Sequence, residues 1–172
     1  SSATARGGFI TLVGGPTFYT GDGRQIYETA IRLQQLSDGT EGFRIRCGFV
    51  QSNALAIFDG IFVQYEDDIN SGKWQLAARD DNNAADTGSV NFDMTVAINT
   101  WYRITLEINS IGSSVTATIW NGTTTESKTL SSGLTDTDEA MAVASYLYKT
   151  SGTGAVSFDC DYISLRTFTA ER

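Results

Sequence analysis

Residues 80–86, "DDNNAAD", concentrate oxygen-bearing side chains in one short segment between two stretches of strand-like sequence. Carboxylate and amide oxygens are the ligands that Ca²⁺ prefers in proteins, so Asp80, Asp81, Asn83 and Asp86 are candidate calcium ligands. The segment lacks the glycine and the closing glutamate of an EF-hand loop, and Asx turns produce the same composition. Both interpretations stay open, and no other cofactor is predicted.

Four other side chains are candidates for binding a carbohydrate or a protein partner. Trp120 points away from the apolar side of its segment, and Arg103 is expected beside it as a cation–π partner. Tyr146 and Tyr148 share one face on either side of Leu147. Sugar-binding sites and protein interfaces both favour exposed aromatic rings, so both kinds of ligand stay open.

Side chains that usually carry acid–base or nucleophilic chemistry are scarce. The chain has no histidine, which removes the usual general base at neutral pH, the histidine-dependent triads and most zinc or copper sites. Cys47 and Cys160 are the two cysteines, each on the apolar side of a strand-like segment. Two buried thiols are favoured over a disulfide, although the spacing does not exclude a bridge between sheets.

The elements that must position these residues are short strands. Apolar and polar residues alternate with a period of two, and segments rich in Asn, Asp and Gly separate the alternating stretches. An even spread of strands and turns favours two antiparallel sheets packed face to face, an all-β sandwich. The predicted strands are 26–36, 43–51, 57–66, 73–80, 89–97, 101–109, 114–121, 124–130, 140–149 and 155–168.

The segment 101–122, "WYRITLEINSIGSSVTATIWNG", predicts a hairpin with a defined register. With the turn at 110–113, Ile108 faces Val115, and the other apolar residues of the two strands pair on the same side. Arg103 then lies opposite Trp120 on the outer side. The rings of Trp101 and Tyr102, at the start of the first strand, are expected to close one end of the sandwich.

Length and charge limit the domain organisation and the partners. The 172 residues suit one sandwich domain over 25–172, preceded by a segment 1–24 that forms an edge strand or docks on a partner. The formal charge of −8 argues against nucleic acid and against membrane insertion. The start lacks both a methionine and a signal-peptide core, so we expect a processed product or an excised domain.

The strand "WYRITLEI", its return strand ending at Asn121-Gly122, and the closing "FDCDYISL" resemble the concanavalin A-like lectin/glucanase jelly roll. The resemblance covers most of residues 25–168 and is to the version found in bacteriophage tail and capsid-surface proteins. It implies a jelly-roll module at a virion surface, as a decoration, fibre or tail protein. The implied partners are other virion subunits, copies of the same chain in a homo-oligomer, and a host surface glycan. The alternative is a carbohydrate-binding module of a secreted or cell-surface bacterial protein.

The same resemblance allows a test for enzymatic residues. Glucanases of this fold carry Glu-x-Asp-x-x-Glu on one strand, and here Glu66 and Asp68 are followed by Ser71, which cannot act as the acid. Residues 66–68 are therefore interpreted as a solvated strand end. Polysaccharide lyases on this scaffold use Tyr with His, Arg or Lys; histidine is missing, but Arg44 and Arg46 share a strand face. We predict that the chain is not an enzyme, with a lyase or glycanase as the remote alternative.

Overall fold

The computed structural model describes residues 7–11, 18–51, 59–80, 85–135, 137 and 140–169. These residues form strands and contain no helix, which confirms the predicted all-β class. The described ranges accordingly hold no helix of the length and apolarity needed to cross a membrane. The strands are β1 (Gly7–Thr11), β2 (Phe18–Tyr19), β3 (Arg24–Leu33), β4 (Phe43–Val50), β5 (Gly60–Tyr65), β6 (Lys73–Arg79), β7 (Gly88–Thr95), β8 (Trp101–Ile108), β9 (Val115–Trp120), β10 (Thr125–Leu130), β11 (Ala140–Lys149) and β12 (Phe158–Phe168).

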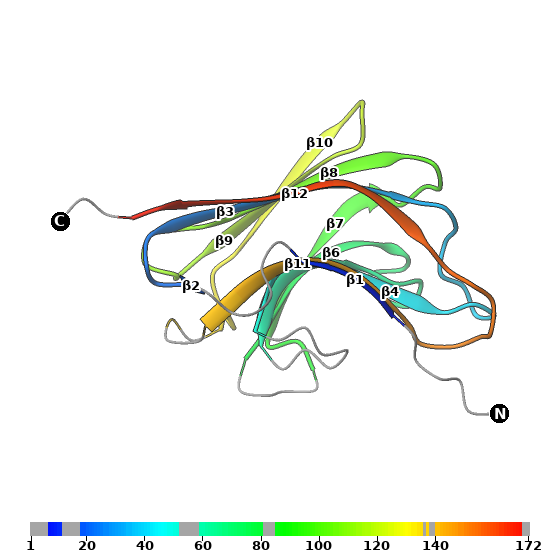
Figure 1. Ribbon diagram of the computed structural model, residues 1–172, viewed down its shortest axis with the longest axis horizontal. Coiled ribbons are helices and arrows are strands. Elements are labelled where there is room, and N and C mark those ends of the chain that lie inside the picture. The colour runs from blue at the N-terminus through cyan, green and yellow to red at the C-terminus, as the bar shows by residue number, and fades with distance from the viewer. Residues whose placement is uncertain are drawn as a thin grey trace.

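The strands form two antiparallel sheets that pack face to face, as predicted (Figure 1). The seven-stranded sheet has the order β1-β11-β4-β5-β6-β7, and β2 pairs with the beginning of β11. The five-stranded sheet has the order β10-β9-β8-β3-β12. The seven-stranded sheet is arched, and its concave side faces away from the other sheet (Figure 1).

The ten strands predicted from alternation correspond to β3–β12, with ends that differ by up to a few residues. The hairpin register is also confirmed, because Ile108 pairs with Val115 and Arg103 pairs with Trp120. Ile108 and Val115 are fully buried. A slip of one residue would move every apolar side chain of the hairpin to the outer side, so burial of one face fixes the register.

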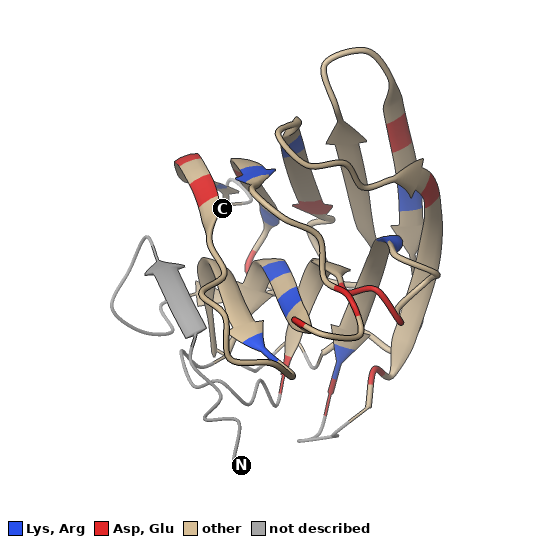
Figure 2. Ribbon diagram, turned by 90° about the vertical axis from the view of Figure 1, so that its right-hand side faces the viewer, with Lys and Arg blue, Asp and Glu red and all other residues tan. Residues whose placement is uncertain are grey.

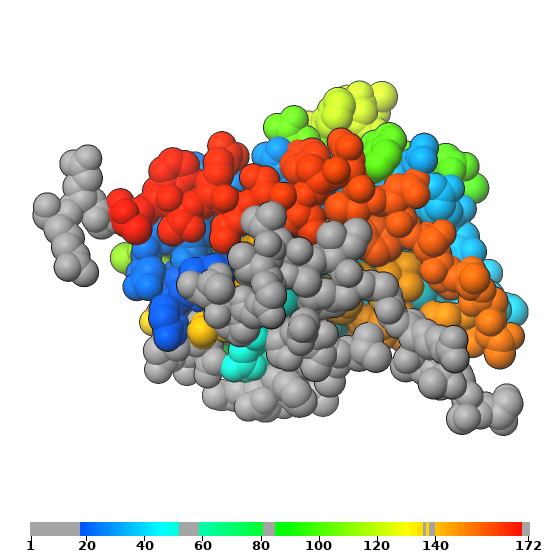
Figure 3. All heavy atoms as spheres, viewed as in Figure 1, coloured from blue at the N-terminus to red at the C-terminus, as the bar shows by residue number. Residues whose placement is uncertain are grey.

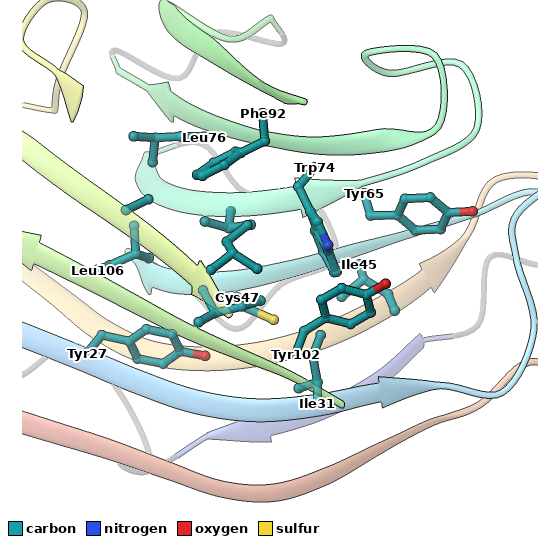
Figure 4. Close-up of a cluster of buried hydrophobic side chains, with 14 of the residues drawn as sticks. Tyr27, Ile31, Ile45, Cys47, Tyr65, Trp74, Leu76, Phe92, Tyr102 and Leu106 are labelled. Carbon is teal, nitrogen blue, oxygen red and sulfur yellow. The ribbon is translucent and has the colours of Figure 1, made fainter. Parts of the chain in front are cut away.

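A series of aromatic rings crosses the core between the sheets. Trp74 of β6 lies between Tyr65 of β5 and Tyr102 of β8, with ring centroids 5.8 and 5.3 Å away and edge-to-face geometry (Figure 4). Phe43 of β4 continues the series with its centroid 6.1 Å from that of Tyr65. Such pairs contribute about 0.5–1.5 kcal/mol each beyond their buried area. The series therefore joins three strands of one sheet to the other sheet.

Trp101 does not close the end of the sandwich, and that prediction is wrong. Successive side chains of a strand point to opposite faces, so only one of Trp101 and Tyr102 can enter the core. Tyr102 is buried, whereas Trp101 is 39% exposed on the outer face of the five-stranded sheet. The guanidinium of Arg32 lies 5.0 Å from the Trp101 ring centroid.

Two asparagines organise the turns on either side of β9. Asn109 Oδ1 accepts hydrogen bonds from the backbone N–H groups of Ser113 and Ser114 at 2.8 and 3.1 Å. Asn121 Oδ1 accepts from the backbone N–H of Thr124 at 2.9 Å. Gly122 follows with a φ of 97°, a conformation that favours glycine. Local turn chemistry thus places β8, β9 and β10 side by side.

The two terminal strands lie at sheet edges. β1 pairs only with β11, which is the edge-strand alternative predicted for the N-terminal segment. β12 pairs with β3 over ten residue pairs and is interrupted by a register shift between Cys160 and Tyr162. The C-terminal part of the chain, ending in β12, runs across the whole width of the face shown in Figure 3.

Cys47 and Cys160 are free thiols in the structure. Cys47 is fully buried in the core, as predicted, whereas Cys160 is only partly buried. The Cys160 sulfur lies 3.7 Å from the hydroxyl of Thr29. That hydroxyl and Tyr27 OH contact the hydroxyl of Ser145 at 3.3 and 2.7 Å, so a few polar groups satisfy one another at the centre of the sandwich.

Burial makes the stability of the fold sensitive to alkaline pH. It raises the pKa of the Cys47 thiol from 9.0 to about 12, so between these values the folded chain retains a proton that the unfolded chain loses. The contribution of this group to the free energy of unfolding is therefore complete below about pH 9 and decreases as the pH rises toward 12. Urea unfolding of wild type should show this loss between about pH 9 and 11.

The Cys47→Ala variant should lose stability less steeply over the same range, by up to about 1.4 kcal/mol per pH unit. Cys160→Ala is the matched control, because Cys160 is only partly buried and its removal should change the slope less. Identical slopes for wild type and Cys47→Ala would contradict the assignment.

Candidate functional site

A row of polar side chains crosses the concave face of the seven-stranded sheet. Strand pairing places one residue from each of five neighbouring strands at the same level. We call these residues the Arg46 row: Tyr146, Arg46, Gln64, Gln75 and Asn91, from β11, β4, β5, β6 and β7 respectively. All five alternate with core residues on their strands, so their side chains share the face that points away from the five-stranded sheet.

Hydrogen bonds connect the row from end to end. Arg46 donates from Nη1 to Tyr146 OH at 3.3 Å and from Nε to Gln64 Oε1 at 3.0 Å. Gln64 Nε2 donates to Gln75 Oε1 at 2.8 Å, and Gln75 Nε2 donates to Asn91 Oδ1 at 2.9 Å. Each amide therefore has its orientation fixed by its neighbour. The row is a connected, prearranged polar network and not a set of independent side chains.

Arg46 is the centre of this arrangement and is 1% exposed. Its guanidinium carbon lies 4.2 Å from the ring centroid of Phe62, on β5 beside Gln64. Its Nη2 is buried and has no hydrogen-bond partner among the described residues. The closest carboxylate oxygen that pairs with this nitrogen is Asp86 Oδ1, at 3.9 Å.

Other guanidinium groups and carboxylates gather around Arg46 on the concave face. Arg79 Nε lies 2.8 Å from Asp86 Oδ1, so Asp86 is shared between two guanidinium groups. Arg44, the outward-facing residue before Arg46, forms an ion pair with Glu66. Arg44, Arg46 and Arg79 thus lie in one group with Glu66 and Asp86, in a chain whose overall charge is −8. Figure 2 shows that several Lys and Arg residues lie within strands and not only in turns.

Tyr146 and Tyr148, predicted together as binding residues, do lie together beside Arg46. Their rings stack at a centroid distance of 6.0 Å and an interplanar angle of 16°. Tyr146 is 1% exposed, whereas Tyr148 is partly exposed and lies 5.9 Å from the Arg46 guanidinium carbon. Burial raises the pKa of the Tyr146 phenol, and the Arg46 charge offsets part of that rise. The Tyr146 hydroxyl is therefore protonated at neutral pH.

Glu66 is not part of a solvated strand end, and that interpretation is wrong. It is 4% exposed and is held by Arg44 on the concave face. Asp67 is partly buried and accepts a hydrogen bond from the hydroxyl of Ser37 at 2.5 Å, and only Asp68 is exposed. Glu66 directly follows β5 and keeps the outward orientation of Gln64, which places it against Arg44.

Trp120 and Arg103 lie on the opposite side of the sandwich, on the outer face of the five-stranded sheet. They pair across β8 and β9 as predicted, and both line a hollow of about 330 Å³. The predicted cation–π contact between them is absent among the described side chains. Arg103 Nε instead lies 3.4 Å from Glu28 Oε1. The four predicted binding residues therefore form two separate sites.

The predicted calcium ligands fall partly outside the described residues, since Asp81 and Asn83 lie in 81–84. Of the others, Asp86 uses both carboxylate oxygens for protein contacts: Oδ1 binds Arg79, and Oδ2 accepts from Gln64 Nε2 at 2.7 Å. No group of three or more carboxylate or cysteine side chains suited to a metal ion occurs in the described ranges. In the described part of the loop, Asp86 thus orders the Arg46 row.

Gln64, Gln75 and Asn91 are not among the site residues predicted from the sequence. One signal was present, because 57–66 and 73–80 were predicted as neighbouring strands around a short turn. A hairpin centred on 67–72 places Gln64 opposite Gln75, which is the observed pair. Two outward-facing amides paired directly across neighbouring strands indicate a polar site on this face of the sheet.

Comparison with known proteins identifies both a family and a set of similar folds. Residues 1–161 match the family described as "SO2946-like, C-terminal domain". No curated protein matches the chain. Among solved structures, alginate lyase PA1167 from Pseudomonas aeruginosa is similar with a TM-score of 0.58 and 11% identity, over 89% of this chain and 68% of the lyase.

Two further structures share the fold. The endo-1,3-β-glucanase of Streptomyces sioyaensis gives a TM-score of 0.57 at 13% identity, over 87% of this chain and 66% of the enzyme. A Lotus tetragonolobus seed lectin gives 0.59 at 8% identity, over 100% of this chain and 96% of the lectin. The chain thus has the jelly-roll fold that lectins, glucanases and polysaccharide lyases share, which confirms the fold resemblance.

Proposed function

The chain belongs to the SO2946-like C-terminal domain family, and from this premise we propose that it binds an acidic polysaccharide across its concave face without cleaving it. The observation that carries the proposal is Arg46, a buried guanidinium at the centre of an ordered polar row, whose Nη2 has no hydrogen bond and whose carboxylate neighbour Asp86, at 3.9 Å, is shared with Arg79. The jelly-roll fold is compatible with this function, because lectins and polysaccharide-degrading enzymes share it.

The charge of Arg46 favours an anionic ligand. Burying a cation without a close counter-ion is costly, and the nearest carboxylate, Asp86, is already bound by Arg79. An anion placed over the row would supply the missing negative charge. Such an anion would accept a hydrogen bond from Nη2 of Arg46, which has no hydrogen-bond partner among the described residues.

The exposed parts of the face supply the direct contacts. Tyr148, Arg44 and Gln75 are partly exposed, and Asn91 is exposed at the far end of the row. Arg46 and Tyr146 lie beneath them at 1% exposure. A chain of sugars lying along the row would stack on Tyr148 and accept hydrogen bonds from the amides of Gln75 and Asn91. The positive charge of the buried Arg46 would attract its carboxylates.

A polyuronate fits these requirements, because each of its sugar residues carries one carboxylate beside several hydroxyl groups. The solved structures with this fold include alginate lyases, named for an acidic polysaccharide of this class. At 7–13% identity they support the fold alone, so the ligand class is proposed from the charge of this chain's own residues.

The contacts of several acid–base groups on this face support binding without cleavage. The Tyr146 phenol is buried and protonated, since burial raises its pKa. The carboxylates of Glu66 and Asp86 are held in ion pairs with Arg44 and Arg79. Proton abstraction from a sugar carbon needs a free base in reach of the ring, and these groups are committed to other contacts.

Titration calorimetry with polymannuronate and polyguluronate oligomers tests the proposal. We expect saturable binding that weakens as salt is raised from about 0.05 to 0.5 M, since the Debye length shortens over this range. Dextran oligomers of equal length, which lack carboxylates, are the matched ligand control and should not bind at this face. Equal affinity for the charged and neutral oligomers, or no binding of either polyuronate, would contradict the proposal.

The same mixtures show whether cleavage occurs. Elimination in a polyuronate creates an unsaturated sugar with strong ultraviolet absorbance, and we expect none to accumulate. Turnover at this face would replace the binding proposal by a lyase, the remote alternative.

We propose a virion surface as the setting, with copies of this chain or other virion subunits as neighbours and a host glycan as the ligand. This setting is a prediction that rests on the sequence resemblance. The alternative setting is a secreted or cell-surface bacterial protein that uses the same face. Electron microscopy of the native source distinguishes a repeated copy on a particle from a single module on a longer chain.

A further inference from the structure

We propose that the hollow beside Trp120 is a second carbohydrate site, which binds one neutral pyranose residue on the outer face of the five-stranded sheet. We call it the Trp120 hollow. It has a volume of about 330 Å³ and is lined by Arg103, Thr105, Thr118, Trp120 and Thr125. Small-molecule sites begin at about 300 Å³, so the hollow suits a ligand of one or two sugar rings.

Two neighbouring levels of the sheet build the hollow. Arg103, Trp120 and Thr125 pair across β8, β9 and β10 at one level. Thr105 and Thr118 pair at the next level on the same face. The large indole thus rises beside shorter threonines, which leaves the depression between them.

The Trp120 ring is available for stacking, because the residue is 44% exposed. The face of an indole carries partial negative charge, and the axial C–H groups of a β-glucopyranose or β-galactopyranose carry partial positive charge. A ring of this type can therefore lie against Trp120 and point its equatorial hydroxyls toward the threonines.

All but one of the side chains with polar groups around the hollow keep donors or acceptors for those hydroxyls. The hydroxyl oxygens of Thr118 and Ser127 lie 2.8 Å apart and form a hydrogen bond. In the described part of the chain, the Trp120 N–H and the hydroxyls of Thr105 and Thr125 have no hydrogen-bond partner. A sugar with several hydroxyls matches such a set of unused donors and acceptors.

A neutral sugar fits better than an acidic one. The Arg103 guanidinium already has a carboxylate beside it, since its Nε lies 3.4 Å from Glu28 Oε1. Glu28 is shared with Arg166, but the Arg103 side chain lies in solvent, so water screens its charge and no ligand carboxylate is needed, in contrast to the buried Arg46. Arg103 is left as a hydrogen-bond donor at the rim, 56% exposed at its side chain. The two faces of the sandwich therefore select different sugars.

Heteronuclear NMR with methyl β-D-glucopyranoside and methyl β-D-galactopyranoside tests this inference. We expect a saturable shift of the Trp120 indole N–H signal, assigned by its loss in Trp120→Phe, with at least one of the two sugars. A single sugar ring bound on one aromatic face should give a dissociation constant on the order of millimolar. Methyl β-D-glucopyranosiduronic acid should bind no more tightly than the neutral sugars.

Trp101 offers a matched control. It lies on the same outer face of β8, 39% exposed, but does not line the hollow. Trp120→Ala should weaken sugar binding by at least about tenfold, and Trp101→Ala by less than about twofold. No saturable shift with either neutral sugar, or equal effects of the two variants, would overturn the inference.

The result is independent of the polyuronate proposal. Arg46→Met alters the opposite face and should leave the response of the Trp120 signal to neutral sugars unchanged. Loss of polyuronate binding with an intact Trp120 response, or the reverse, identifies which of the two proposals has failed.

Discussion

Arg46→Met is expected to weaken polyuronate binding about ten- to a hundredfold, while Arg46→Lys retains affinity within several-fold. The reason is electrostatic. A unit charge about 6 Å from a carboxylate contributes up to about 3 kcal/mol at an effective dielectric of about 20. Methionine removes that charge and approximates the length of the arginine stem, whereas lysine keeps the charge and loses the planar fork. Calorimetry at low salt measures the difference.

Two controls separate a charge effect from a folding effect. Arg103→Met removes a guanidinium from the opposite face and should leave polyuronate affinity unchanged. The melting temperature of Arg46→Met shows whether the sheet remains folded when Gln64 Oε1 loses its donor. If Arg46→Met binds polyuronate as tightly as wild type and with the same salt dependence, the concave face does not act through this charge.

Trp74→Ala is expected to destabilise the fold by about 3–5 kcal/mol, the range found when a buried aromatic side chain is truncated. Trp74 is fully buried and lies between Tyr65 and Tyr102. Its indole Nε1 has no hydrogen-bond partner among the described residues, so its contribution comes from packing. In a chain of this length the melting temperature should fall by roughly 6–20 °C.

Trp101→Ala is the matched control for Trp74→Ala, because it deletes an indole from the surface. Its effect should lie near 0.5 kcal/mol, as is usual for surface substitutions of about this kind. Differential scanning calorimetry of both variants checks the contrast. If the two variants lose similar amounts of unfolding free energy, the aromatic series does not hold the sheets together.

The fold was predictable because burial and alternation are coupled in this chain. In β8, Tyr102, Ile104 and Leu106 are buried while the residues between them remain at least partly exposed. A pattern of that kind defines both the strand and the side that enters the core. It fixes the hairpin register as well, since β8 and β9 are joined by a short turn.

The concave site was only partly predictable, because its residues meet through strands that are far apart in sequence. Arg46 and Tyr146 are separated by 100 positions and become neighbours only when β11 pairs with β4. Alternation indicates that a side chain points outward but not which of the two sheets carries it. For this reason Tyr146 and Trp120 were predicted together, although they lie on opposite sides of the sandwich.

Glu66 illustrates a second limit. Its position at a strand end, before two aspartates, is typical of a solvated segment. Its burial depends on an ion pair with Arg44 of the neighbouring strand. The alternation of polar and apolar residues within one strand does not show such a contact. Charged residues at strand ends are therefore the least certain part of such predictions.

The positions of β1 and β12 determine how this domain carries mechanical load. β1 begins in the right half of Figure 1 and β12 ends at the left, each at the edge of a different sheet. Hydrogen bonds in an antiparallel ladder run perpendicular to the strands, so tension between Gly7 and Phe168 pulls along both strands and strains many bonds at once. Such shearing resists extension better than peeling one bond at a time.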